Sequence, residues 1–422
     1  MRSLPSHRCG TRRVRVVDAA GAGIAHAQVT ARMTRHAFGL GCIGFDFIDH
    51  AFGTDGGGHL FGGASAARAP ALEDLWFAVF NQATLPFYWR GFEPEPGRPD
   101  TARMAAAARW FRERGARVKG HPLLWHTLAP AWLRGLSDDD LVATIRARIL
   151  REAGDFAGLV DQWDAINETV ILPVFTAEDN AVTRLAQRRG RLEVVRLAFE
   201  SARAADPAAR LVINDFDLSE AYERVIEEYL DAGLPVDAIG LQTHMHQGFR
   251  GEDQLAHILD RFARFGLPLQ LTETTLVSGD LMPPEIVDLN DYQPAHWPST
   301  PEGEDRQARE IVRHYTVAWE HPAVESVTYW GLTDEGAWLG APAGLVHADA
   351  TPKPAYEALR TLVREHWWTP PVIETADAEG WVTLSGTAGT YAVSVPGREE
   401  IAVEVTASPA APLAWAPHHV RT

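Results

Sequence analysis

Gln162-Trp-Asp-Ala-Ile166 is a short, largely apolar stretch that is typical of a buried strand. Apolar residues recur three and four positions apart before it, over Asp139–Ala153, and after it, over Leu192–Ala205. This spacing indicates amphipathic helices on both sides of the strand. A strand between two helices is the building unit of a parallel sheet whose faces are covered by helices.

The same alternation of strand and helix continues along most of the chain. Further strands are expected at Phe38–Phe45, Val118–Leu124, Arg210–Asn214, Ala238–Gln242, Leu267–Thr272 and Ser326–Trp330, and further helices at Ser219–Asp231, Gly251–Phe265 and Arg306–Glu320. Repeated strand–helix units at this spacing predict an α/β fold of the (β/α)8 TIM barrel type.

Both ends of the chain have a different pattern, with short alternating strands and few helical signals. Val14 and Val16 lead into a turn before Val29, and the segments after Pro370 alternate in a similar way. The sequence predicts an N-terminal β-hairpin extension over 1–36, the barrel over 37–368 and a small C-terminal β module over 369–422. Whether this module pairs with the N-terminal hairpin stays open. Within the barrel, the long Pro- and Asp-rich loop Val277–Glu304 is expected to form a rim over a site.

The charge of the chain limits its partners. Its 422 residues include 39 Lys and Arg against 56 Asp and Glu, which gives a formal net charge of −17. An acidic surface repels phosphate backbones and anionic lipids, so we expect neither nucleic acid nor a membrane as a partner. No run approaches the ~20 apolar residues that span a bilayer.

The N-terminal segment, Met1 to Arg15, is basic but has no apolar stretch behind it, so it does not have the pattern of a signal peptide. The sequence as written predicts a cytoplasmic protein, and a trimmed or misassigned N-terminus would leave secretion open. Cys9 and Cys42 are too few for a disulfide framework, and whether they form a single bridge stays open.

Two glutamates stand at the ends of predicted strands. Glu168 follows Asn167 directly after one strand, and Glu273 follows Thr272 at the end of a later one. In a barrel of this kind the carboxyl ends of the strands carry the chemistry. A lone glutamate there is more often a solvated loop residue. A pair is what cleavage of a glycosidic bond needs, because one carboxyl protonates the leaving oxygen while the other attacks or activates water.

Other strand ends combine hydrogen-bonding groups with indole rings, which is the mixture that sugar hydroxyls and C–H faces require. These residues are His121, Trp125 and His126 after one strand, Gln242 and His244 in another, and Trp330 and Trp338 after the last. Either of the last two indoles, taken alone, would fit ordinary core packing equally well.

Two other classes of function fit parts of this pattern. A metal-dependent hydrolase would take its ligands from His121, His126, His244, His246 and Asp334. It would leave the two strand-end glutamates without a role. A barrel that binds sugar without cleaving it is the other alternative, and the intact glutamate pair argues against it.

Taken together, these motifs resemble glycoside hydrolase family 10, whose best-known members are endo-β-1,4-xylanases. The resemblance runs roughly from Phe38 to Leu362 and includes the closing segment Pro352-Lys-Pro-Ala-Tyr356. It implies that Glu168 is the acid/base and Glu273 the nucleophile. It also implies that Asn167 holds the sugar hydroxyl next to the scissile bond. The chain's counterparts of the family residues around the cleaved sugar are His121, Trp125, Gln242, His244, Trp330 and Trp338.

The chain departs from the family in the segment Phe80-Asn-Gln-Ala-Thr84-Leu-Pro-Phe-Tyr88-Trp89. The family has Thr-x-Glu-Asn-x-x-Lys-Trp there, and its Glu, Asn and Lys grip sugars on the non-reducing side. Here the Glu-Asn pair is absent and Tyr88 replaces the Lys, so we expect Tyr88 and Trp89 to contact substrate instead. A second departure is Thr275, where the family commonly has an acidic residue; its hydroxyl can accept a hydrogen bond from His244 but adds no charge.

The resemblance implies a retaining β-glycoside hydrolase that cleaves β-1,4-xylosidic bonds in xylan or xylo-oligosaccharides by double displacement. It implies no metal and no cofactor. The partner would be a β-linked carbohydrate that contains xylose. The altered segment around Tyr88 leaves open a different β-linked oligosaccharide or a plant glycoside as the substrate.

Overall fold

The computed structural model describes residues 4–54, 57–59, 62–408 and 411–415. The chain divides into two compact units. One comprises residues 40–359 and is called the barrel unit below. The other combines residues 1–39 with residues 360–422 and is called the terminal unit.

Eight strands close into a barrel in which each strand lies between its neighbours in chain order. They are β3 (Gly39–Ile43), β6 (Gln82–Pro86), β7 (Arg117–His121), β8 (Gln162–Asn167), β9 (Arg210–Asp215), β10 (Ala238–Met245), β11 (Leu269–Leu276) and β12 (Val324–Tyr329). Neighbouring strands run parallel, as in the pairs β6–β7 and β10–β11. The predicted (β/α)8 barrel is confirmed.

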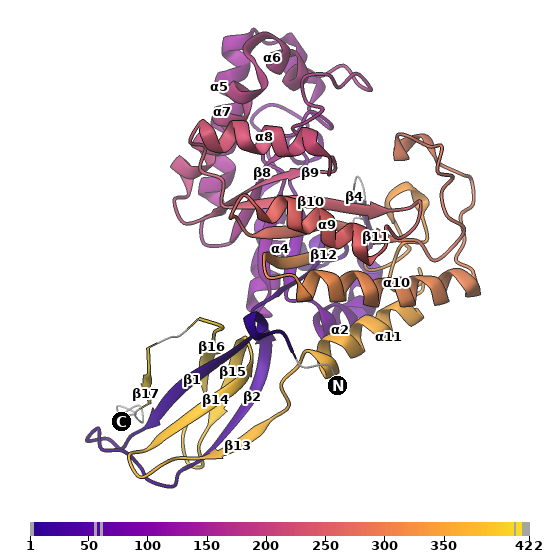
Figure 1. Ribbon diagram of the computed structural model, residues 1–422. Coiled ribbons are helices and arrows are strands. Elements are labelled where there is room, and N and C mark those ends of the chain that lie inside the picture. The colour runs from indigo at the N-terminus through magenta and orange to yellow at the C-terminus, as the bar shows by residue number, and fades with distance from the viewer. Residues whose placement is uncertain (1–3, 55–56, 60–61, 409–410, 416–422) are drawn as a thin grey trace. The chain divides into compact units, whose positions relative to one another are not determined.

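Helices connect these strands and lie around them (Figure 1). They are α1 (Ile48–Phe52), α2 (Ala69–Val79), α3 (Trp89–Phe92), α4 (Thr101–Glu113), α5 (Asp138–Asp155), α6 (Ala181–Arg189), α7 (Arg191–Ala205), α8 (Glu220–Asp231), α9 (Glu252–Ala263), α10 (Pro301–Glu320) and α11 (Pro354–Thr361). On the barrel, α4 packs against β7, α7 against β8, α9 against β11 and α10 against β12. A small ribbon of β4 (Gly57–His59) and β5 (Gly62–Ser65) lies between α1 and α2 in the sequence.

One barrel strand, β6, is absent from the strands that the sequence pattern predicts. All five of its residues are buried, but polar Gln82 and Thr84 interrupt its apolar character. It ends at Pro86, which has no N–H to continue a ladder of hydrogen bonds. The sequence of this fully buried strand therefore has the pattern of a polar segment that ends in proline.

The strand β8 illustrates how side chains are divided between the two faces of the barrel. Side chains alternate along a strand, so Trp163 and Asp164 point to opposite sides. The Trp163 ring packs edge-on against Phe87 and Phe156, with centroids 4.7 and 6.2 Å away. Asp164 instead lies 2.8 Å from the Lys119 ammonium, and both side chains are only 1% exposed. The interior of the barrel thus holds a buried ion pair below the strand ends.

The terminal unit is built from two sheets. One has the order β14 (Trp381–Thr387), β1 (Cys9–Val16), β17 (Leu413–Trp415), and the other the order β13 (Val372–Thr375), β2 (Gln28–His36), β15 (Gly389–Ser394), β16 (Ile401–Val405). A single hydrophobic core includes Val14 from β1, Val29 from β2 and Val405 from β16. Each sheet contributes one apolar face to this core.

The predicted N-terminal hairpin (1–36) and C-terminal module (369–422) are parts of this one unit. β1 pairs with β14, and β2 pairs with β13 and β15, so the two N-terminal strands lie in different sheets and do not form a hairpin with each other. An isolated two-stranded segment is at best marginally stable in water. Pairing with strands from the other end of the chain buries both apolar faces, and the barrel unit is correspondingly shorter than 37–368.

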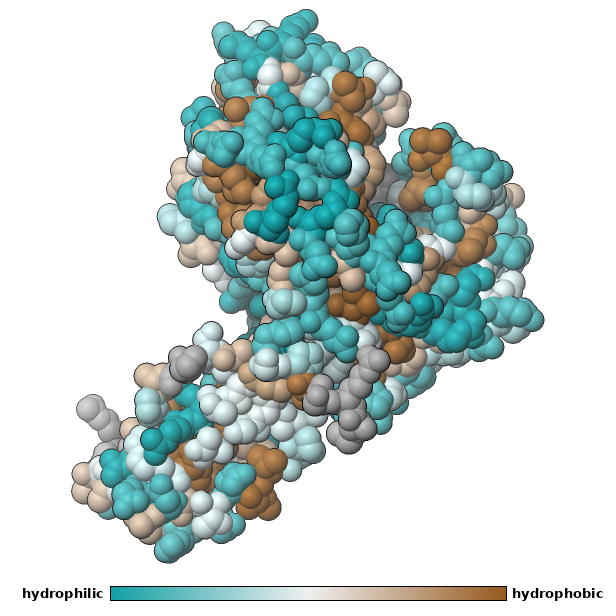
Figure 2. All heavy atoms as spheres, in the orientation of Figure 1, coloured by the Kyte–Doolittle hydropathy of each residue, from teal (hydrophilic) through white to brown (hydrophobic). Residues whose placement is uncertain are grey.

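The surface is mostly hydrophilic on the face drawn in Figure 2, with apolar residues in separate groups over the barrel unit.

In the part of the chain that the structure describes, helices are all too short or too polar to cross a membrane. Cys9 and Cys42 are both free thiols, so the bridge that the sequence left open is not formed.

Candidate active site

The two predicted catalytic glutamates lie at the carboxyl ends of barrel strands. Glu168 is the first residue after β8, and Glu273 lies in the second half of β11. Glu273 is 5% exposed. The Glu168 carboxyl is partly accessible, with 14% of its side chain exposed. The barrel closure brings these two carboxyls, more than a hundred positions apart in the sequence, to the same end of the barrel.

Asn214 joins the surroundings of the two glutamates. Its Nδ2 donates hydrogen bonds to Asn167 Oδ1 and to Glu273 Oε1, both at 2.8 Å. Thr272 Oγ1 donates to Asn214 Oδ1 at 2.5 Å, which fixes the orientation of the amide. Gln242 Nε2 donates to the same Asn167 oxygen at 3.1 Å. One buried amide therefore connects Glu273 with the residue that precedes Glu168.

The Glu168 carboxyl is surrounded in a way that favours its protonated form. Trp125 Nε1 donates a hydrogen bond to Glu168 Oε2 at 2.9 Å. Burial is the main effect that raises the pKa of Glu168 well above its usual range, and the negative charges of Asp215 and Glu273 add to it. The hydrogen bonds from Trp125 and Gln242 oppose this increase but do not cancel it. The raised pKa keeps Glu168 protonated to higher pH than an exposed glutamate.

Glu273 accepts hydrogen bonds from two directions. Asn214 Nδ2 approaches Oε1, and His244 Nε2 lies 3.2 Å from Oε2. The His244 ring is held from behind by Thr275, whose Oγ1 is 3.3 Å from His244 Nδ1. The hydroxyl that replaces the family's acidic residue thus occupies the expected position beside His244. These contacts orient the Glu273 carboxyl and place hydrogen-bonding groups against both of its oxygens.

His121 is fixed by the ion pair inside the barrel. Its Nδ1 lies 2.7 Å from Asp164 Oδ2, and the other Asp164 oxygen is 2.8 Å from Lys119 Nζ. Burial works against the charge on Asp164, yet Lys119 and His121 together lower the pKa of this carboxyl below its usual value. His121 Nε2 is 3.9 Å from Glu273 Oε1. The His121 ring is therefore held with one nitrogen toward the barrel interior and the other toward Glu273.

Aromatic rings surround this polar centre. The Trp330 ring lies 5.2 Å from the His121 ring, and the Trp338 ring lies 4.7 Å from the His244 ring. Tyr88 packs edge-on against His121 at 5.6 Å. It also lies 5.8 Å from Trp125 and 6.3 Å from Phe45. The predicted binding residues that the structure brings together around the two glutamates are Tyr88, His121, Trp125, Asn167, Gln242, His244, Trp330 and Trp338.

Trp89 is the predicted binding residue that the structure places elsewhere. It starts α3 and is 3% exposed. Its Nε1 donates to Glu93 Oε2 at 3.1 Å, and the Arg148 guanidinium lies over its ring at 4.5 Å. The short helix turns the Trp89 ring away from Tyr88 and into a structural cluster of charged groups. Neighbouring positions in a turn point in different directions, which the sequence could not resolve.

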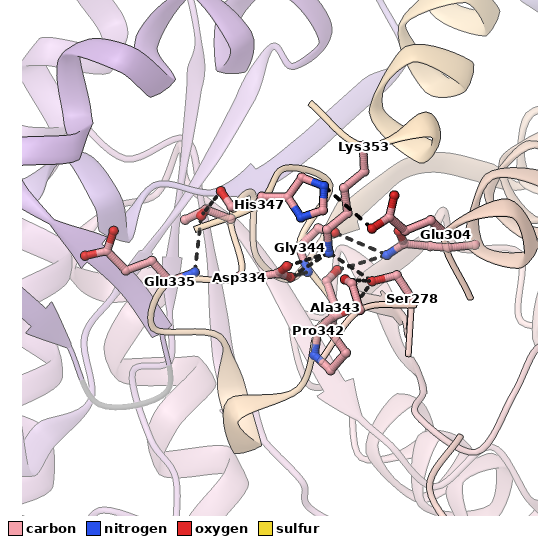
Figure 3. A network of polar contacts seen from close by, with 12 residues as sticks. Ser278, Glu304, Asp334, Glu335, Pro342, Ala343, Gly344, His347 and Lys353 are labelled. Carbon is pink, nitrogen blue, oxygen red and sulfur yellow. Dashed lines mark hydrogen bonds and ion pairs between the residues drawn. The ribbon is translucent and has the colours of Figure 1, made fainter. Parts of the chain in front are cut away.

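The possible metal ligands are dispersed. His126 and His246 are buried, and burial is the main effect that lowers the pKa of each ring to about 3, so both are neutral. Asp334 faces a different partner, because both of its oxygens are 2.7 Å from Lys353 Nζ (Figure 3). Across the described ranges, no group of three or more His, Cys, Asp or Glu side chains is arranged to hold a metal ion.

The long loop Val277–Glu304 packs on its own small core. Trp297 and Met282 of the loop are buried with Ala341 and Ala343 from the segment after β12. Trp297 lies 6.2 Å from the ring of His246, which in turn lies 5.2 Å from that of Trp338. A cavity of about 700 Å³ opens between the loop and this segment, lined by Trp297, Pro298, Ser299, Asp334, Gly340, Ala341, Pro342, His347, Ala348, Asp349 and Thr351. Neither glutamate lines it.

Several residues of the site were not singled out from the sequence. Asn214 and Asp215 end β9, and Lys119 and Asp164 lie inside the barrel. The signal for the first two was present, because polar residues at a strand end are the positions to weigh in a barrel. Lys119 and Asp164 are buried within β7 and β8, but nothing in the local sequence pattern separates them from exposed charges.

Comparison with known proteins identifies the family to which the chain is similar. The model of Glycosyl hydrolase family 10 matches residues 71–362. The chain is 28% identical over 284 residues to a beta-1,4-xylanase of Dictyoglomus thermophilum, which covers 63% of this chain and 75% of the relative. It is 26% identical over 280 residues to endo-1,4-beta-xylanase 3 of Hypocrea jecorina. This alignment covers 64% of this chain and 71% of the relative.

Among solved structures, xylanase 10B of Thermotoga petrophila, crystallised with xylobiose, superimposes with a TM-score of 0.57 at 25% identity. The superposition covers 68% of this chain and 86% of that structure. The family match spans more than half of the chain and includes both strand-end glutamates. The chain therefore belongs to glycosyl hydrolase family 10.

Proposed function

We propose that the protein is a retaining β-glycoside hydrolase that cleaves β-1,4-xylosidic bonds in xylan or xylo-oligosaccharides. The observation that carries the proposal is the asymmetry of the two linked glutamates. Glu168 has a strongly raised pKa, whereas Glu273 accepts hydrogen bonds from Asn214 and has a histidine beside it. Family membership and the names of the relatives support xylan as the substrate.

In the first step Glu273 attacks the anomeric carbon and Glu168 gives its proton to the leaving oxygen. The indole N–H of Trp125 and the amide of Asn167 lie against the Glu168 carboxyl and hold it in place. As the bond breaks, the C1–O electron pair goes to the departing sugar and the proton of Glu168 neutralises it. Glu273 becomes an ester of the remaining sugar.

In the second step water attacks the anomeric carbon of this ester. Glu168, now ionised, takes a proton from the water, and Glu273 leaves as a carboxylate. Two displacements at one carbon restore the β configuration. We assign His121, Gln242 and Trp330 to the cleaved sugar, because their ring face and hydrogen-bonding groups lie next to the glutamate pair and a sugar needs both.

A second candidate substrate is a different β-linked oligosaccharide or a plant glycoside. Tyr88 favours it, because this residue is 5% exposed and packs against Phe45, His121 and Trp125. A buried phenol ring there offers less hydrogen bonding than the family's Lys and Glu-Asn pair. A substrate with a single sugar on the non-reducing side would match this surface better.

The test is a comparison of xylo-oligosaccharides with other aryl and alkyl β-glycosides, with proton NMR of the first product. We expect release of a β-configured hemiacetal that mutarotates later, and highest kcat/KM on xylose-based substrates. Better turnover of a non-xylose glycoside would select the second candidate. An α-configured first product would contradict the retaining mechanism itself, whichever sugar is preferred.

A further inference from the structure

Asp215 is a buried carboxyl that the two-glutamate mechanism does not use. It is the last residue of β9 and is 0% exposed. Its Oδ1 accepts a hydrogen bond from the Asp217 N–H and its Oδ2 accepts one from the Val170 N–H, both at 2.9 Å. Val170 stands two positions after Glu168. A carboxyl in β9 is therefore tied to the loop that carries the acid/base.

This tie matters because the backbone at Glu168 is strained. Glu168 has a φ of +55°, in the left-handed region. For a residue with a Cβ this conformation costs ~1–2 kcal/mol, so the surroundings must impose it. The Glu168 N–H donates to the Asn214 carbonyl at 2.8 Å, and the Val170 N–H donates to Asp215. The last two residues of β9 thus grip the strained turn on both sides of Glu168.

Asp215 also belongs to the charged surroundings of Glu168. The groups facing Glu168 are Trp125, Asn167 and Gln242 by hydrogen bonds, His126 with Nε2 at 3.7 Å, the Tyr88 phenol, and the carboxyls of Asp215 and Glu273. His126 is neutral, since burial lowers its pKa to about 3. The surrounding charges are therefore negative, and they disfavour ionisation of Glu168.

Asp215 itself faces the Glu168 carboxyl, Asp217, and the phenols of Tyr222 and Tyr229. Burial is the main effect that raises the pKa of Asp215 to about 7, and the backbone N–H groups of Asp217, Val170 and Phe216 work against this increase. Asp215 and Glu168 thus share a region in which two negative charges are unfavourable, and their ionisations are linked.

We propose that Asp215 is a positioning residue for the acid/base, which fixes the strained turn at Glu168 and keeps the Glu168 proton in place until the leaving oxygen takes it. The inference rests on the proposed function, because it assigns Asp215 a task in proton donation. It acts through Glu168 and touches no substrate. A merely structural Asp215 would affect all substrates equally, whereas this role depends on the leaving group.

The test compares wild type with Asp215→Asn on two substrates. One is a dinitrophenyl β-xylobioside, whose leaving group departs without a proton, and the other is xylotetraose, whose leaving sugar needs one. We expect Asp215→Asn to lose about 10- to 100-fold in kcat/KM on xylotetraose and less than about 3-fold on the aryl substrate. The alkaline limb of the xylotetraose profile should move to lower pH, because one neighbouring negative charge is gone.

The matched control is Asp206→Asn. Asp206 is also buried, and its Oδ1 accepts the N–H groups of Ala208 and Ala209 before the start of β9. It makes the same kind of contact but lies at the opposite end of the strand from Glu168. We expect Asp206→Asn to leave the ratio of the two kcat/KM values and the alkaline limb as in wild type. Equal losses on both substrates in Asp215→Asn, or an unmoved limb, would overturn the inference.

Two further variants keep the test decisive. If Asp215→Asn is unstable, Asp215→Ser keeps a short acceptor near Val170 without the charge, and the same pattern is expected. In a Glu168→Ala background, Asp215→Asn should cause no further change on the aryl substrate, and an additional loss there would contradict a role through Glu168. A wild type that cleaves neither substrate would instead refute the proposed function.

Discussion

Glu168 and Glu273 are the same residue type at the same end of one barrel, yet their surroundings give them different chemistry. Glu168 stands among other carboxyls and beside an indole, with a raised pKa. Glu273 accepts from Asn214 and has His244 Nε2 at 3.2 Å. Two carboxyls with opposite surroundings are what a donor of protons and a nucleophile require. The division of labour is therefore set by neighbouring side chains.

The raised pKa of Glu168 has a direct consequence for the pH dependence. The acid must be protonated to act, so kcat/KM is expected to fall as the pH rises through the raised pKa of Glu168. Glu168→Gln should remove this alkaline limb and lower kcat/KM on xylotetraose by about 100- to 10,000-fold. A pH–rate profile of both proteins checks this. An alkaline limb that survives in Glu168→Gln would show that another group titrates.

At the scale of elements, β7 shows how closely the strands are fitted to the site. Gly120 lies between Lys119 and His121, and a Cβ at Gly120 would stand 2.1 Å from the Trp163 ring on β8. Backbone and indole thus meet directly between these two strands. The absence of a side chain at Gly120 allows His121 to reach both Asp164 and Glu273.

Gly120→Ala is therefore expected to displace β7 or the Trp163 ring. We expect a loss of about 1–3 kcal/mol in the free energy of unfolding and a clear fall in kcat, because His121 moves with the strand. Gly135→Ala is the control, since nothing lies within 4 Å of a Cβ there. Urea unfolding and steady-state rates give both readouts. A Gly120→Ala protein as stable and active as Gly135→Ala would refute the close fit.

A second element-scale prediction concerns the connection from β12 to α11. Lys353 is fully buried, and its Nζ contacts both oxygens of Asp334 and donates to Ser278 Oγ (Figure 3). Lys353→Met leaves the Asp334 charge without its partner in a mostly buried place. We expect this variant to lose about 3–5 kcal/mol in the free energy of unfolding.

Two comparisons give this prediction its controls. The double variant Lys353→Met with Asp334→Asn should lose less, because the charge is removed and the amide oxygen can still accept from the Gly344 N–H. Arg98→Met breaks an exposed pair with Glu95 and should change stability by less than about 1 kcal/mol. If Lys353→Met were as mild as Arg98→Met, the ion pair would not hold this connection.

At the scale of the whole molecule, the sequence predicted most of the barrel but little of its interior. Alternating strands and helices were readable because each has a regular period, and the two glutamates because they follow apolar strands. β6 was hidden by its polar residues and proline. Lys119 and Asp164 could not be predicted because their roles arise only when distant strands close into a barrel, whereas Asn214 stands at a strand end and carried a usable signal.

The ends of the chain illustrate the same limit. Short strands were readable at both ends, but their partners lie hundreds of positions away, and no local pattern encodes that pairing. The orientation of Trp89 depended on one turn of helix at α3. Periodicity thus predicts elements and strand ends, whereas closure, pairing and the direction of side chains in turns follow from tertiary packing.

The most direct measurement of the central claim is capture of the glycosyl ester on Glu273. A dinitrophenyl β-xylobioside with fluorine at C2 of the cleaved sugar reacts in the first step and is hydrolysed slowly in the second. We predict that peptide mass spectrometry of the treated protein finds the fluorinated sugar attached to Glu273, and that Glu273→Ala neither carries the label nor turns over substrate. A label on another residue, or near-normal turnover by Glu273→Ala, would contradict the account.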